Sequence, residues 1–96
     1  MRRLQGAAAR AYQDLLAAQP TTPAKVAFAW RVAAGPVLGR AAATRWTDDG
    51  TLSVLARDAA WQREIGRARP LIADRLAQLL GPGVVRRIEI QIDRGR

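Results

Sequence analysis

Cysteine and histidine, two residue types on which much protein chemistry depends, are both absent from this sequence of 96 residues. Without cysteine the chain can form no disulfide and offers no thiolate nucleophile, and without either residue it lacks the usual zinc ligands. The absence of histidine also removes the side chain that most often transfers protons near neutral pH. We therefore expect a protein that is not an enzyme and that needs neither a metal nor another cofactor.

Several patterns typical of catalytic or membrane proteins are also missing. Ser53 is the only serine, and the sequence places it on a strand with no base beside it. The stretch Gly81-Pro82-Gly83 lacks the Lys-Ser/Thr that follows a phosphate-binding glycine loop. No run of about 18 apolar residues predicts a membrane span, and the residues after Met1 lack the apolar stretch of a signal peptide. These observations favour a cytoplasmic protein.

Acidic residues are scarce relative to basic ones, which number 16 against 8 and give a formal net charge of +8. All but one of the basic residues are arginine, whose planar guanidinium binds phosphate in a fork and stacks on bases. The excess is concentrated in residues 1–46, where seven basic side chains accompany one acid. This balance favours an anionic partner, nucleic acid first, and the alternative is that it serves solubility alone.

Hydrophobic residues make up 49% of the chain and recur at helical spacing in its first half. Residues 3–18 and 23–34 each show an apolar stripe, which predicts two amphipathic helices, and Thr22 is placed to cap the second. The Gly35-Pro36 pair breaks this second helix. A short helical turn over residues 36–42 is expected to follow.

Two apolar residues of the second helix, Phe28 and Val32, point nearly opposite to its main stripe. Such a helix is either buried on both sides or partly covered by a partner, and we expect burial within the domain. Trp30 and Trp61 lie on apolar stripes and are expected in the core. Trp46 alternates out of phase with its strand neighbours, so it is either a core residue or a stacking platform for a base.

Two strands, a long helix and a final strand are predicted for the second half of the chain. Residues 43–48 and 51–57 flank an Asp-Asp-Gly turn, which is a typical hairpin signal. Asp58 can cap a helix that ends before the Gly-Pro-Gly sequence, and Pro70 is expected to kink or divide this helix. Residues 84–93 alternate isoleucine with polar residues, which predicts a strand with one buried face.

The resulting order, α-α-β-β-α-β, predicts a single domain over residues 1–96 with an ordered core of about residues 3–93. Three strands with helices on one face form a two-layer α/β sandwich of the α+β class. Because the third strand follows a helix, we expect it to run parallel to one strand of the hairpin, which gives a mixed sheet.

Six arginines are candidates for nucleic-acid contact. Arg63 and Arg67 lie four residues apart on the polar side of the long helix, where their like charges repel each other. A phosphate backbone bound nearby would offset this repulsion and be attracted by both charges. Glu64 is the alternative partner of Arg67, and Arg69 directly precedes the proline. A second group flanks the Gly-Pro break with no acidic residue between its members. It consists of Arg31, Arg40 and Arg45.

A series of short motifs extends over about residues 10–92. The motifs are Trp30, Gly35-Pro36, Asp49-Gly50-Thr51-Leu52-Ser53-Val54, Ala59-Ala60-Trp61-Gln62-Arg63-Glu64-Ile65, Leu76 to Gly81 and Val85 to Ile88. Each motif alone is weak, but their order and spacing are fairly specific. Together they resemble the DciA family, bacterial proteins that assist the replicative DNA helicase.

The resemblance implies a fold like a type II KH domain and binding to the replicative helicase and to single-stranded or forked DNA. It implies a role in placing the helicase ring on single strands, without assigning helicase contacts to particular residues. KH domains that grip RNA use a Gly-x-x-Gly loop, and the matching stretch here, Gly66-Arg67-Ala68-Arg69, lacks the second glycine. A KH-like RNA-binding protein is the alternative function, and a purely structural adaptor is a third possibility.

Overall fold

A computed structural model describes residues 20–94 of the chain, so the helix predicted for residues 3–18 lies outside the described residues. The remaining order, α-β-β-α-β, agrees with the sequence prediction. The elements are α2 (Pro23–Arg40), β1 (Ala42–Thr47), β2 (Thr51–Ala56), α3 (Ala59–Leu80) and β3 (Arg87–Ile92). The last strand begins three residues later than predicted.

The three strands form one sheet in the order β1-β2-β3. Strands β1 and β2 are antiparallel and are joined by the predicted Asp-Asp-Gly turn, whereas β2 and β3 are parallel and are joined through α3. The predicted mixed sheet is therefore confirmed. A parallel pair needs a long crossover connection, and the 22-residue helix α3 supplies it.

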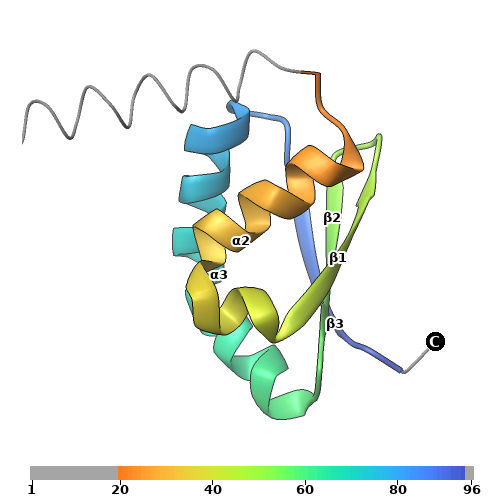
Figure 1. Cartoon of the computed structure of the whole chain (residues 1–96), viewed down its shortest axis with the longest axis vertical. Helices are drawn as coiled ribbons and strands as arrows, with labels where there is room; N and C mark the ends of the chain where they lie inside the picture. Colours follow the sequence, from red (N-terminus) through yellow and green to blue (C-terminus); the bar gives the residue numbers. More distant parts are fainter. Residues whose placement is uncertain (1–19, 95–96) are drawn as a thin grey trace, which may run out of the picture.

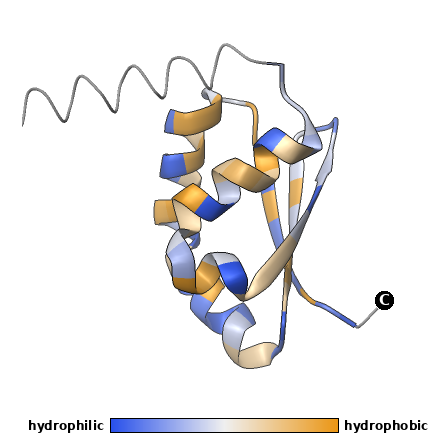
Figure 2. Ribbon diagram, viewed as in Figure 1, coloured by the Kyte–Doolittle hydropathy of each residue, from blue (hydrophilic) through white to orange (hydrophobic). Residues whose placement is uncertain are grey.

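Both helices lie on the same side of the sheet, which makes the fold a two-layer α+β sandwich, as predicted (Figure 1). The central strand buries Leu52, Val54 and Ala56 completely against the helices. Hydrophobic and hydrophilic residues alternate along α3 and β3, and the apolar ones contribute to this core (Figure 2). None of the described elements covers the opposite face of the sheet, which we call the outer face.

Thr22 caps the start of helix α2, as the sequence predicts. Its hydroxyl oxygen accepts a hydrogen bond from the Lys25 amide at 3.1 Å. The predicted break is also present, because Gly35 has φ 86° and ψ 172° and the helix continues in a new direction from Pro36. Residues with a side chain rarely adopt this positive φ, so glycine is the residue that permits the bend. We call this bend the elbow.

The expected burial of Phe28 and Val32 is wrong for the described part of the chain, where the two side chains are 42% and 46% exposed. Helix α2 packs against α3 and β1 through its other side, which buries Val26, Ala29 and Trp30. A helix in the outer layer of a two-layer fold has only one side to bury, so an apolar second side is left exposed.

Helix α3 is continuous through Pro70, so of the two expected effects, a kink or a division, the division does not occur. Asp58 caps it by accepting a hydrogen bond from the Trp61 amide at 3.0 Å, as predicted. Pro70 has no amide N–H, so the Gly66 carbonyl lacks its helical hydrogen-bond partner. Because Gly66 is exposed, water can donate to that carbonyl instead. In the part of the chain that the structure describes, neither helix has the length and hydrophobicity that a membrane span requires.

Candidate nucleic-acid interface

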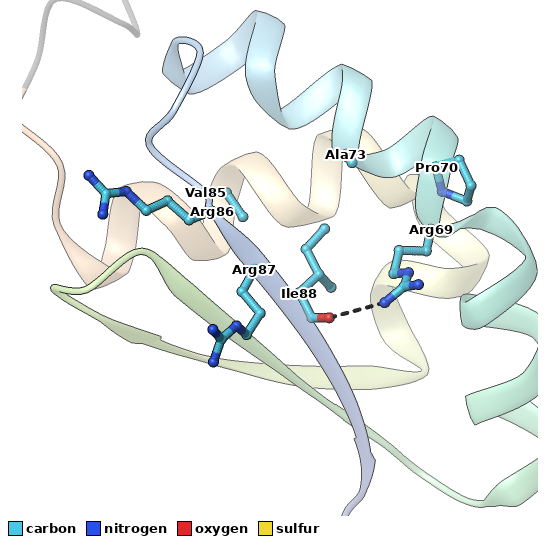
Figure 3. A pocket seen from close by; sticks show the side chains of 7 residues that line it. All are labelled: Arg69, Pro70, Ala73, Val85, Arg86, Arg87 and Ile88. Carbon is cyan, nitrogen blue, oxygen red and sulfur yellow. Dashed lines mark hydrogen bonds between the residues drawn. The ribbon is translucent and has the colours of Figure 1, made fainter.

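A hollow of about 330 Å³ lies between the middle of α3 and the start of β3 (Figure 3). Three arginines line it beside apolar residues, one from α3 and two from the start of the strand, and the ends of the Arg86 and Arg87 side chains extend away from the hollow (Figure 3). The lining residues are Arg69, Pro70, Ala73, Val85, Arg86, Arg87 and Ile88. Small and apolar groups below with charged groups around them form a surface suited to an anionic polymer.

The hollow exists because β3 is the edge strand and α3 runs along its free edge. Residues 88 and 90 direct their carbonyl groups away from β2, and two polar side chains of α3 donate to them. Arg69 Nη1 donates to the Ile88 oxygen at 3.5 Å, and Gln62 Nε2 donates to the Ile90 oxygen at 3.0 Å. These hydrogen bonds connect the helix to the free edge of the strand on either side of the groove.

A second hollow of about 380 Å³ continues along the same edge towards the end of β3. It is lined by Gln62, Ile90, Gln91, Ile92 and Arg94. Both hollows lie between α3 and β3, and we call them together the α3–β3 groove. Arginines stand at both of its ends, with Arg69, Arg86 and Arg87 at one end and Arg94 at the other.

The hairpin turn holds the two arginines at the start of β3. The Gly50 carbonyl accepts hydrogen bonds from the amides of Arg86 at 2.8 Å and Arg87 at 3.1 Å. Gly50 has φ 91°, and a Cβ atom at this position would lie 2.8 Å from Cγ of Arg86. The arginine stem therefore lies directly over the glycine, and the turn fixes where both arginine side chains begin.

Replacing Gly50 with alanine is expected to lower the free energy of unfolding by about 1–3 kcal/mol, because the positive φ is strained for a side-chain-bearing residue and Arg86 must move. Thermal or urea unfolding measures the loss. Gly66→Ala is the matched control, since Gly66 lies in α3 with open space around it and alanine there should stabilise the helix by about 0.5–1 kcal/mol. Equal unfolding temperatures for Gly50→Ala and the wild type would contradict this assignment.

The same turn holds an acidic side chain. The Thr47 hydroxyl donates to Asp49 Oδ1 at 2.6 Å, and the Thr51 amide donates to the same oxygen at 3.1 Å. The hydrogen bond from Thr47, followed by those from Thr51, holds the pKa of Asp49 below its usual value. The Asp48–Asp49 pair thus serves turn chemistry, as its sequence context indicates.

A depressed pKa in the folded state means that the ionised form of Asp49 stabilises the fold. This contribution is fully present above the unfolded-state pKa of about 3.9 and disappears as the pH falls through the lower folded-state value. We expect wild type to unfold at a higher temperature than Asp49→Asn near neutral pH and the difference to shrink in acid. Thermal unfolding of both proteins across this range measures it, and a difference that does not change with pH would count against the assignment.

The six arginines predicted from the sequence do not lie on one surface. On α3, Arg63 is exposed, Arg67 pairs with Glu64 at 3.3 Å, and Arg69 lines the α3–β3 groove. The other three candidates lie elsewhere. Arg31 and Arg40 line a hollow at the elbow of α2. Arg45 stands on the outer face of the sheet, where it is opposite Ser53 in the strand register.

Sequence reasoning does not select Arg86, Arg87 and Arg94, although all three border the groove. Two consecutive arginines at the start of a predicted strand are a usable signal, because neighbouring side chains on a strand point to opposite faces. Arg86 and Arg87 indeed extend in different directions (Figure 3). Arg87 also pairs with Glu89 at 3.8 Å on the exposed surface.

The tryptophans differ in burial. Trp30 is buried in the core, as predicted, whereas Trp61 is only partly buried and has the Arg57 guanidinium 5.9 Å from its ring centre. Trp46 packs partly against the core and also lines a hollow at the hairpin, so it combines features of both alternatives that the sequence left open. None of the three lines the α3–β3 groove.

Within residues 20–94 no three acidic side chains lie close enough together to hold a metal ion. The architecture is that of a small two-layer α+β domain with a mixed sheet and an arginine-bordered groove between its long helix and its edge strand. The family model described as Dna[CI] antecedent, DciA, matches residues 3–90, so the chain belongs to the DciA family. This membership implies a role related to the loading of the replicative helicase. No curated protein matches the chain.

Proposed function

We propose that this protein is a non-enzymatic accessory of DNA replication that binds the replicative helicase and single-stranded or forked DNA in the cytoplasm. It assists the placement of the helicase on single strands. Family membership supports the helicase part of the proposal. The observation that carries the DNA part is the α3–β3 groove, with arginines at both ends.

Two arginines in or near the groove are held only by exposed carboxylates. Arg87 is paired with Glu89 at 3.8 Å, and Arg67 on the adjacent helix is paired with Glu64 at 3.3 Å, but both pairs are exposed at the surface. Exposed ion pairs contribute about 0–1 kcal/mol each, so exchanging the carboxylate for a phosphate costs little. The apolar floor between the charged groups gives the sugars and bases a surface to contact.

RNA binding is the second candidate function, because the family resemblance implies a KH-like fold. The parallel pair β2–β3, joined through α3, agrees with the mixed sheet expected from the order of the elements. In this chain, however, residues 66–69 lie inside the continuous helix α3, where RNA-gripping KH domains have a loop. Titrations with single-stranded DNA and RNA of the same sequence decide between the two, and a clear preference for RNA would favour the second candidate.

The helicase part is tested by binding of the purified cognate helicase to the full chain. We expect binding at micromolar concentration or tighter, and none at that concentration would count heavily against the proposal. A helicase-loading assay on single-stranded DNA, with and without this protein, tests the consequence. Equal helicase activity on the strand in both reactions would argue against a role in loading.

Replacing Arg63 and Arg67 together with alanine is expected to flatten the dependence of log DNA affinity on log salt. The slope should fall by about 0.7 for each single-strand phosphate that the variant no longer neutralises. Fluorescence anisotropy across a salt series measures it. Arg31→Ala with Arg40→Ala removes the same charge from a different surface and is the matched control. An unchanged slope in the Arg63 and Arg67 variant would show that these two residues do not contact DNA phosphates.

A further inference from the structure

The elbow of α2 combines exposed apolar side chains with positively charged ones. Phe28, Val32 and Val37 are 42%, 46% and 66% exposed, and they are three of the four large apolar residues exposed in the described part of the chain. We define the elbow surface by these three residues together with Arg31 and Arg40.

The residues before the bend share one face of the helix. Phe28, Arg31 and Val32 are separated by three and four positions, which places them side by side on the side opposite the buried stripe. Gly35 follows Arg31 by one further turn, so the face leads directly into the elbow. A ligand lying along this face would contact aliphatic, aromatic and guanidinium groups together.

The bend encloses a hollow of about 560 Å³, lined by Arg31, Gly35, Pro36, Gly39 and Arg40. A Cβ atom at Gly39 would lie 3.5 Å from Cα of Arg31, so the chain after the bend packs closely against the chain before it. The hollow has glycine and proline between its two arginines. Bulky groups of a partner can therefore enter between the two guanidinium groups.

The charged residues that define this surface are both basic, although Asp93 lines a neighbouring hollow together with Arg40. No acidic residue occurs between Asp14 and Asp48 in the sequence, so α2 itself offers no carboxylate to its arginines. Two exposed ion pairs, Arg67 with Glu64 and Arg87 with Glu89, lie away from it on α3 and β3. The complement of the elbow surface is therefore both apolar and acidic.

Nucleic acid fits this surface less well than protein does. Protein–DNA interfaces are polar and strongly charged, whereas exposed valine and phenylalanine side chains gain most from an apolar partner. An amphipathic helix laid against a hydrophobic strip is a recurring mode of recognition, and charged residues at its margins set its orientation. Carboxylates at those margins would pair with Arg31 and Arg40.

We propose that the elbow surface docks an acidic amphipathic helix of the replicative helicase. This inference rests on the proposed function and adds a location to it. The helicase is bound at the elbow, and DNA is held in the α3–β3 groove, whose lining shares no residue with the elbow hollow. The two binding activities are therefore separable by substitution.

The test uses the full chain, the purified cognate helicase and single-stranded DNA. Phe28→Ser with Val32→Ser leaves the net charge unchanged and should weaken helicase binding by about 30-fold or more, as expected when apolar side chains are removed from the centre of an interface. DNA affinity and unfolding temperature should stay at wild-type values. Leu71→Ser changes the fourth exposed apolar residue, which lies on α3, and is the matched control expected to bind normally.

A second variant, Arg31→Glu with Arg40→Glu, provides an independent test if the serine variant unfolds. Both arginines are exposed, so their replacement should not disturb the core. This variant should weaken helicase binding at least as much, and Phe28→Leu with Val32→Ile should retain it. Failure of the wild-type protein to bind helicase would overturn the proposed function and this location together. Normal helicase binding by both elbow variants, with wild-type binding intact, would overturn the location alone.

Other occupants of the elbow surface give different results. If residues 1–19 of the same chain cover it, the serine variant should lose thermal stability while helicase binding persists. If a second copy covers it, analytical ultracentrifugation should show a wild-type dimer that the serine variant dissociates. If nucleic acid covers it, DNA affinity should fall in the serine variant and helicase binding should not. Each of these results would overturn the helicase-docking proposal.

Discussion

Replacing Trp30 with alanine is expected to lower the free energy of unfolding by about 3–5 kcal/mol, the usual range for a buried tryptophan. Trp30 is 2% exposed and belongs to the set of largest buried side chains, between α2 and the sheet. Domains of ordinary stability have about 5–15 kcal/mol in total, so this one change should remove a large share. Urea unfolding followed by circular dichroism measures the loss.

The matched control is Trp30→Phe, for which the expected loss is much smaller. The indole Nε1 of Trp30 is buried and has no hydrogen-bond partner among the described residues. A buried donor without a partner costs about 1–3 kcal/mol, and phenylalanine removes that donor while it keeps most of the aromatic volume. The gain partly offsets the smaller cavity. A Trp30→Phe variant as unstable as Trp30→Ala would show that the indole has a partner.

The second large effect concerns DNA. Replacing Arg69, Arg86 and Arg87 together with alanine is expected to weaken single-stranded DNA binding by about 100-fold at low salt, if each charged group contributes about 1 kcal/mol. The slope of log affinity against log salt should fall by about 2, because three phosphates are no longer neutralised. Anisotropy titrations over a salt series measure both quantities.

The control for this experiment removes the same total charge from other surfaces. Arg31→Ala, Arg40→Ala and Arg45→Ala together take three guanidinium groups from the elbow and from the outer face of the sheet. They should change DNA affinity much less than the groove variant does. Equal losses in the two triple variants would mean that DNA responds to net charge and not to the α3–β3 groove.

The secondary structure is predictable because its signals are local. Thr22 and Asp58 cap helices as their positions before apolar stripes indicate, and the alternating isoleucines of β3 indicate a strand with one buried face. Of the two effects expected at Pro70, a kink or a division, the division does not occur, because α3 packs against the core on both sides of the proline. Ile65 and Ile72, which are buried before and after the proline, keep the helix continuous through it.

The candidate site is only partly predictable. Arg69 follows from the sequence pattern and lines the groove, but Arg86 and Arg87, which are not selected from the sequence, line it too. Their proximity depends on where α3 crosses the edge strand, which brings together residues nearly twenty positions apart, such as Arg69 and Ile88. No pattern within either segment specifies that crossing.

The sequence by itself determined the elements, their order, the mixed sheet and the basic character of the protein, because these follow from periodicity, capping and composition. Only the tertiary structure decided which arginines share a surface. Arg31 and Arg40 line one hollow because α2 bends at Gly35, whereas the strand register places Arg45 on the outer face of the sheet. The packing of the helices against the sheet sets the directions in which their side chains point. No single segment of the sequence specifies that packing.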